Sequence, residues 1–234
     1  MAEAIRDSCN VYFYEVGLRL GIDKLDEYAS LFGLGRKTGL ELWEATGEVA
    51  GPETSKKYNQ TWYEGETMYA AIGQGSTQVT PIQLANYTAT LVNGGSHYPT
   101  HLLKTVKSSD FSQVLEEYHP QPLNTLELDA KNLDAIKNGM GMVVTEGSIA
   151  RYFRGLGVQV GAKTGTAQVA GHTEANAVLV AFAPYDEPEI ALCIVVEQGG
   201  SGSLVGAIAS EIIEYYFSAK EAMDAPTWEN TLVK

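Results

Sequence analysis

The stretch Ala162-Lys-Thr-Gly-Thr-Ala-Gln168 lies where the hydrophobic pattern of the chain changes. It falls inside a segment, 159–169, that predicts a strand, and two nearly continuous apolar runs follow at 176–183 and 189–196. Runs of this length and composition are typical of strands covered on both faces of a sheet. The turn Pro184-Tyr-Asp-Glu-Pro188 separates these two runs, so we predict an antiparallel hairpin preceded by one more strand.

Helical periodicity dominates on either side of these strands. Apolar spacing, capping residues and stop residues predict helices at 10–21, 22–32, 80–93, 129–145 and 204–217. Two stretches lack a sustained period: 36–66, where we expect a long loop, and 96–124, where we expect irregular chain with short strands.

This order of elements predicts one α+β domain, an antiparallel sheet flanked by helices. We expect its helical part at about 1–150, its strand hairpin and closing helix at about 157–218, and a tail at 219–234.

Composition excludes several classes of partner. The chain has 234 residues with 16 Lys and Arg against 29 Asp and Glu, a formal net charge of −13, so no nucleic-acid partner is expected. Pro99 separates His97 from His101 and argues against a helical metal site, so no metal or cofactor is predicted. Cys9 and Cys193 form no C-x-x-C pattern, and we expect both in the core.

The Lys163-Thr-Gly-Thr-Ala167 segment carries the chemistry. Strand alternation sends Lys163 and Gly165 to one face and Thr164 and Thr166 to the other. A glycine inside a strand often marks close approach of a ligand, and hydroxyl and ammonium groups beside it could hold a carboxylate. The alternative is a surface strand with a solvated lysine.

Ser8-Cys-Asn10 is the second candidate, at the start of a predicted helix. Taken alone, Ser8 is expected to cap that helix. Together with the distant Lys-Thr-Gly strand, the Ser-x-Asn triplet supplies two of the three motifs of penicillin-binding proteins and serine β-lactamases.

Further motifs extend this match over nearly the whole chain. With them the chain resembles the transpeptidase domain of penicillin-binding proteins, most of all the class B, monofunctional group. They are Ala4-Ile-Arg-Asp-Ser-Cys-Asn-Val-Tyr-Phe13, Gly33-Leu-Gly-Arg-Lys-Thr-Gly39, Ile72-Gly-Gln-Gly75, Val79-Thr-Pro-Ile-Gln-Leu-Ala85, Asn93-Gly-Gly95 and Ala162-Lys-Thr-Gly-Thr-Ala-Gln168.

One departure from the family stands out. Its nucleophile is the serine of an S-x-x-K motif several dozen residues before the S-x-N triplet, and no serine of this chain has a lysine three positions later. Thr54-Ser-Lys-Lys57 and Thr231-Leu-Val-Lys234 have the spacing with threonine, but are expected in a loop and at the terminus. We therefore expect the C-terminal part of a transpeptidase domain, inactive alone.

The resemblance implies a role for each motif residue. Ser8 would relay a proton to the leaving amine, and Asn10 would bind the donor amide. Lys163 would raise the local positive potential. Thr164, Gly165 and Thr166 would form the substrate-binding strand, with the two hydroxyls on the donor carboxylate and the Thr166 N–H in the oxyanion hole.

The resemblance also implies the setting. The parent would be a peptidoglycan D,D-transpeptidase that binds stem peptides and β-lactams, works with other cell-wall synthesis proteins, and lies on the extracytoplasmic face of the bacterial membrane, anchored by a segment absent here. Two family strands would be missing beside 189–196, which leaves three strands, an exposed apolar edge and a tendency to self-associate. The alternative function is a non-catalytic peptide-binding or regulatory module that uses the same strand.

Overall fold

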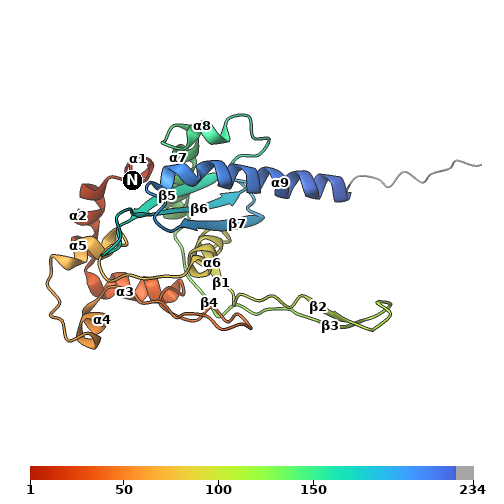
Figure 1. Cartoon of the computed structure of the whole chain (residues 1–234), viewed down its shortest axis with the longest axis horizontal. Coiled ribbons are helices and arrows are strands. Elements are labelled where there is room, and N and C mark those ends of the chain that lie inside the picture. The colour runs from red at the N-terminus through yellow and green to blue at the C-terminus, as the bar shows by residue number, and fades with distance from the viewer. Residues whose placement is uncertain (225–234) are drawn as a thin grey trace, which may run out of the picture.

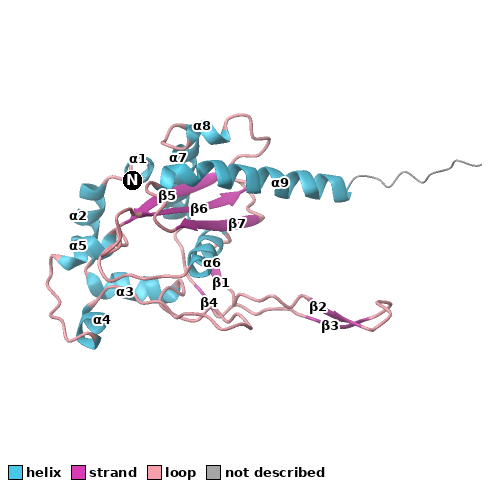
Figure 2. Cartoon of the chain, in the orientation of Figure 1, coloured by secondary structure: helices cyan, strands magenta, loops and turns pink. Residues whose placement is uncertain are grey.

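A three-stranded antiparallel sheet forms the centre of the computed structural model, which describes residues 1–224 (Figures 1 and 2). The sheet consists of β5 (Gly161–Ala167), β6 (Asn176–Ala183) and β7 (Ile190–Val196), in that order, so β6 is the central strand. The predicted α+β class and the three predicted strands are confirmed.

The other elements follow the sequence prediction closely where the apolar period is long. They are α1 (Ala2–Arg6), α2 (Asn10–Leu20), α3 (Ile22–Leu31), α4 (Pro52–Lys57), α5 (Glu66–Ala71), α6 (Pro81–Val92), β1 (Ser96–His97), β2 (Thr105–Lys107), β3 (Val114–Glu117), β4 (Asn124–Thr125), α7 (Ala130–Thr145), α8 (Ala150–Phe153), η1 (Gly202–Val205) and α9 (Gly206–Asp224).

Capping explains why α6 and α7 begin where they do. Thr80 and Gln83 form a reciprocal capping box, and Pro81 stands in the first turn, where its missing N–H costs nothing. Asp129 caps α7 by accepting a hydrogen bond from the Asn132 backbone N–H.

Both faces of β6 are buried. Leu179 and Phe182 are each 0% exposed, and alternation along the strand places them on opposite faces. The Phe182 ring lies below the Lys137 ammonium of α7, whereas α9 and η1 also pack on β6. The apolar runs therefore predicted correctly a strand covered on both faces.

Two glycines let helices approach closely enough to place the N-terminal segment. A Cβ at Gly139 of α7 would lie 2.7 Å from the Ile5 Cβ of α1. A Cβ at Gly17 of α2 would lie 2.4 Å from the Ala71 Cβ of α5. Neither distance is compatible with an ordinary carbon contact, so these glycines are packing positions.

The prediction of an uninterrupted loop at 36–66 was wrong. Residues Pro52–Lys57 form α4, and α5 already begins at Glu66. Pro52 occupies the first position of α4, where its fixed φ favours a helical turn, although six residues are too few for a visible period. Thr54-Ser-Lys-Lys57 thus lies in a helix, while Thr231-Leu-Val-Lys234 is outside the described residues.

Other boundaries and burial calls differ as well. The closing helix continues past Phe217 to Asp224, into the segment expected as the tail, of which 225–234 lie outside the description. Cys9 is exposed, not buried, because it precedes α2 at the surface, and Cys193 is half-buried. Burial raises the pKa of the Cys193 thiol to about 11.

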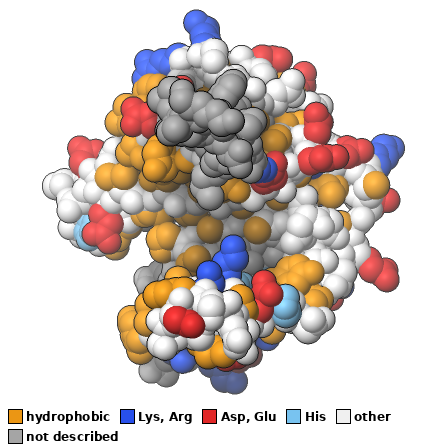
Figure 3. Space-filling model, turned by 90° about the vertical axis from the view of Figure 1, so that its right-hand side faces the viewer, with side chains coloured by type: hydrophobic (Ala, Val, Ile, Leu, Met, Phe, Trp, Pro, Cys, Tyr) orange, Lys and Arg blue, Asp and Glu red, His pale blue; other side chains and the backbone are white. Residues whose placement is uncertain are grey.

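An arm built from β2 and β3 projects from the body (Figure 1). Viewed from the tip of this arm, hydrophobic side chains are visible on its surface and on the body behind it (Figure 3). Phe111 and Leu115 on the arm are 78% and 63% exposed. A two-stranded ribbon this short has too little apolar surface to form a core of its own.

The close approach of α2 and α5 yields a stability prediction. Gly17→Ala should lower the free energy of unfolding by about 2 kcal/mol, because overpacking outweighs the higher helix propensity of alanine. The double variant Gly17→Ala/Ala71→Gly restores the space and should regain most of this loss. Urea unfolding of both variants at one protein concentration checks the pair, and a single variant as stable as the parent chain would contradict it.

Candidate functional site

A cleft of about 1010 Å³ lies beside β5, where residues far apart in the sequence meet. The α1–α2 corner, the segment after α5, and helices α6 and α7 contribute the other walls. All six residues predicted for the site line this cleft: Ser8, Asn10, Lys163, Thr164, Gly165 and Thr166.

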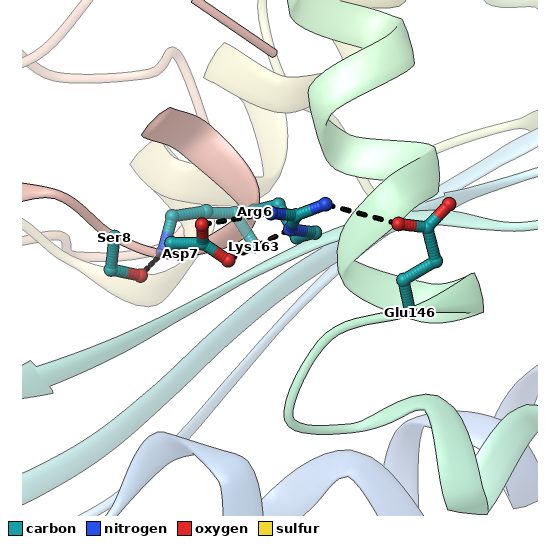
Figure 4. Close-up of polar contacts among 5 residues, drawn as sticks. All are labelled: Arg6, Asp7, Ser8, Glu146 and Lys163. Carbon is teal, nitrogen blue, oxygen red and sulfur yellow. Dashed lines mark hydrogen bonds and ion pairs between the residues drawn. The ribbon is translucent and has the colours of Figure 1, made fainter. Parts of the chain in front are cut away.

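Lys163 connects two of the predicted motifs directly (Figure 4). Its Nζ donates to the Ser8 Oγ at 2.5 Å and to the Thr164 carbonyl oxygen at 2.7 Å. Burial lowers the pKa of the Lys163 ammonium, since the charged form loses solvation at this position. The interpretation of Lys163 as a freely solvated surface lysine is therefore wrong.

Ser8 is held in an unusual backbone conformation. Its φ is 51°, in the left-handed region that residues with a Cβ rarely adopt. Cys9, not Ser8, is the N-cap of α2, and no side chain caps that helix. The expectation that Ser8 is a helix cap was wrong, because its hydroxyl accepts from Lys163 across the cleft.

A charged cluster fixes the chain just before Ser8 (Figure 4). The Arg6 guanidinium donates to both carboxylate oxygens of Asp7, at 2.7 and 2.9 Å, and to Glu146 Oε2 at 3.0 Å. These hydrogen bonds from Arg6 lower the pKa of the Asp7 carboxyl group. Since Glu146 follows α7, the cluster ties the corner that carries Ser8 to that helix.

The remaining predicted residues occupy complementary walls. Asn10 is the first residue of α2 and lies on the cleft side opposite β5. Along β5, the Lys163 side chain reaches Ser8, whereas the Thr166 Oγ1 accepts from the Gly202 backbone N–H at 3.2 Å. These contacts agree with the predicted alternation of the two faces.

Two contacts at this site were not predicted from the sequence. The Gln74 side-chain amide donates to the Thr166 carbonyl oxygen at 3.3 Å, and Gly202 contributes the contact to the Thr166 hydroxyl. Both residues belong to glycine-rich segments visible in the sequence, Gly73-Gln-Gly75 and Gly199-Gly-Ser-Gly-Ser203. Composition alone does not show which strand such loops contact.

Neither a metal site nor a second serine–lysine pair emerges from residues 1–224. No group of three metal-ligating side chains occurs among them. The Thr54 hydroxyl donates to the Val49 carbonyl oxygen at 2.6 Å, and Lys57 pairs with Glu48, so Thr54 and Lys57 do not form an activated pair. Within the same range, no helix is both long and apolar enough to cross a membrane.

An α+β fold in which S-x-N and K-T-G side chains meet in one cleft defines the class of penicillin-recognising serine enzymes. The chain belongs to the family of penicillin-binding protein transpeptidase domains: the description "Penicillin binding protein transpeptidase domain" matches residues 1–214.

Known proteins of this family are similar along the whole chain. The peptidoglycan D,D-transpeptidase MrdA of Escherichia coli K12 is 30% identical over 251 residues, which cover 100% of this chain and 39% of that protein. The structure of Pseudomonas aeruginosa PBP2 in complex with WCK 5153 is 36% identical, with a TM-score of 0.78, over 97% of this chain and 49% of the other.

A Helicobacter pylori structure adds a complex. PBP2 in complex with MreC is 32% identical, with a TM-score of 0.79, and the match covers 93% of this chain and 40% of the other. The chain thus spans less than half the length of each of these relatives.

Proposed function

We propose that this chain is the donor-binding part of a class B peptidoglycan D,D-transpeptidase, an acyltransferase that cross-links stem peptides and is inhibited by β-lactams. The hydrogen bond between Lys163 and Ser8 carries the proposal, because it joins the second and third family motifs at one point of the cleft. The similarity to MrdA supports it.

Each site residue has a role that its surroundings favour. Ser8 accepts a proton-bearing ammonium and retains its own hydroxyl proton, so it can relay a proton to a leaving amine. Lys163 provides positive potential where the donor carboxylate binds. Asn10, on the opposite wall, donates to the peptide amide of the donor.

The substrate-binding strand is β5. Thr164 and Thr166 bind the terminal carboxylate of a D-Ala-D-Ala donor through their hydroxyl groups, and Gly165 leaves room for the donor backbone beside the strand. The Thr166 N–H is one donor of the oxyanion hole, the other being the N–H of the nucleophilic serine.

The nucleophile lies outside these residues, because no S-x-x-K motif occurs among the 234. Without a serine to acylate, the chain forms no acyl-enzyme. In the longer parent the domain acts on the extracytoplasmic face of the membrane, held by an anchor and associated with other cell-wall synthesis proteins.

A first prediction concerns acylation of the chain as it stands. After incubation with a labelled penicillin, intact-protein mass spectrometry should show no ester-linked one-to-one adduct, because no activated serine is present. A complete transpeptidase domain of a relative, treated in the same way, serves as the positive control. A hydroxylamine-sensitive adduct on this chain would contradict its inactivity.

A second prediction concerns Lys163 in a domain supplied with the S-x-x-K segment of a relative. Lys163→Ala should slow acylation by penicillin about 100-fold or more, because it removes an electrostatic stabiliser of the transition state. The control is Lys131→Ala, which removes an exposed lysine of α7 and should leave the rate unchanged. Equal rates for both variants would assign Lys163 a structural role only.

Exposed apolar surfaces support a further proposal, self-association of the isolated chain. β7 is an outer strand of the sheet, and Ile208, Ile212 and Tyr215 form an exposed stripe on α9, with 45%, 40% and 77% exposure. Val11 on α2 is 75% exposed. Unpaired strand edges and contiguous apolar patches favour association between chains.

Sedimentation velocity at micromolar concentration checks this proposal, with dimers or larger species as the expected result. Ile208→Glu/Ile212→Glu should reduce association if it runs through α9, and Val196→Lys should reduce it if β7 edges pair. A monomer at all concentrations would exclude association through either surface.

A further inference from the structure

The outer edge of β5 is the side of the sheet that faces the cleft. β5 pairs with β6 on its inner side, and within residues 1–224 no strand pairs with its outer side. In an antiparallel ladder the backbone N–H and C=O of one residue point to the same side. A partner that binds the Thr166 carbonyl oxygen from the cleft therefore also indicates that the Thr166 N–H points into the cleft.

Gln74 is that partner. Its side-chain Nε2 donates to the Thr166 carbonyl oxygen at 3.3 Å, between residues 92 positions apart in the sequence. The Gln74 backbone N–H donates to the Tyr69 carbonyl oxygen at 2.9 Å, which fixes the base of the side chain to the end of α5. Gly73 and Gly75, with φ of 73° and 79°, form the turns on either side of Gln74.

Thr166 is also held from its other face. The Gly202 N–H donates to Thr166 Oγ1 at 3.2 Å, and a Cβ on Gly202 would lie 2.1 Å from the Gly165 carbonyl oxygen. Only glycine allows η1 to come this close. Because the hydroxyl oxygen accepts from Gly202, its own proton stays available to donate toward the cleft.

We propose that Gln74 is a positioning residue for the oxyanion hole: it holds the Thr166 peptide at the strand edge so that the Thr166 N–H points at the reacting carbonyl. This inference rests on the proposed transpeptidase function for its catalytic consequence. It gives the Gly73-Gln-Gly75 segment, far from the other motifs in the sequence, a part in the reaction without contact to the substrate.

The hydrogen bond itself can be tested on the chain as it stands, independently of any activity. Labelling with carbonyl-¹³C threonine and ¹⁵N alanine makes only two Thr–Ala peptides visible by NMR, Thr88–Ala89 in α6 and Thr166–Ala167 in β5. Gln74→Ala should shift the Thr166 carbonyl resonance and leave that of Thr88 in place. Gln60→Ala, which changes an exposed glutamine in a loop, should shift neither.

The catalytic consequence is tested in the domain supplied with an S-x-x-K segment. Gln74→Ala should slow the acylation step by about 10-fold with the non-covalent penicillin affinity unchanged, since a displaced oxyanion donor costs less than the roughly 100-fold to 1000-fold loss of a removed one. Gln60→Ala should react at the parental rate.

A pH profile separates positioning from simple packing. In Gln74→Glu the side chain is a carboxylate at pH 7 to 8 and repels the Thr166 carbonyl oxygen, whereas the protonated acid can donate to it. The rate relative to the parent domain should therefore recover as the pH falls toward about 4.5, near the ordinary glutamate pKa. Gln74→Ala should show no such recovery.

The outcomes separate the two proposals. A parent domain that penicillin does not acylate would overturn the transpeptidase function, and the Thr166 resonance would still decide whether Gln74 holds this peptide. An unshifted Thr166 resonance in Gln74→Ala, or acylation of that variant at the parental rate, would overturn the positioning role of Gln74.

Discussion

The hydrogen bond from the Lys163 ammonium to the Ser8 hydroxyl spans 155 positions of the sequence, and the geometry of the cleft depends on it. It requires Lys163 to point from β5 toward the α1–α2 corner, which the pairing of Lys163 with Val180 determines. It also requires Ser8 to lie at that corner, which depends on the contact between α1 and α7 at Gly139. A one-residue slip in β5 would send Lys163 to the opposite face and separate the two motifs.

A partly buried ammonium is costly unless its surroundings compensate for lost hydration. Here burial lowers the Lys163 pKa, and the hydrogen bonds to Ser8 and to the Thr164 carbonyl oxygen offset part of that cost. No carboxylate pairs with Lys163 among residues 1–224. A positive group held without a protein counter-ion, next to two threonine hydroxyls, suits a ligand that brings its own carboxylate.

The two outer strands of the sheet illustrate different uses of an unpaired edge. An open edge usually invites pairing with another chain. At β5 the edge is placed in a cleft and contacted by Gln74, so its backbone groups are available to a ligand of limited size. At β7 the edge has no such cover from the described residues. The first edge therefore fits recognition of a peptide-like donor, and the second fits protein–protein contact.

The sequence by itself determined the elements with long periods and strong punctuation. The β6 and β7 runs, the Thr80-Pro81 start of α6 and the Asp129 start of α7 are local signals, read without knowledge of the fold. The site residues were also found, because Ser-x-Asn and Lys-Thr-Gly are specific motifs. The short helix α4 was missed, since six residues are shorter than two helical turns.

Only the tertiary structure decided how the motifs act on one another. Ser8 looks like a helix cap in the sequence, and its left-handed φ and contact with Lys163 arise from packing between distant segments. Gln74 and Gly202 occur in glycine-rich turns whose partners no local pattern specifies, yet both bind Thr166. The physical reason is that a hydrogen bond between distant residues depends on strand register and helix packing, which the whole chain sets together and no short segment encodes.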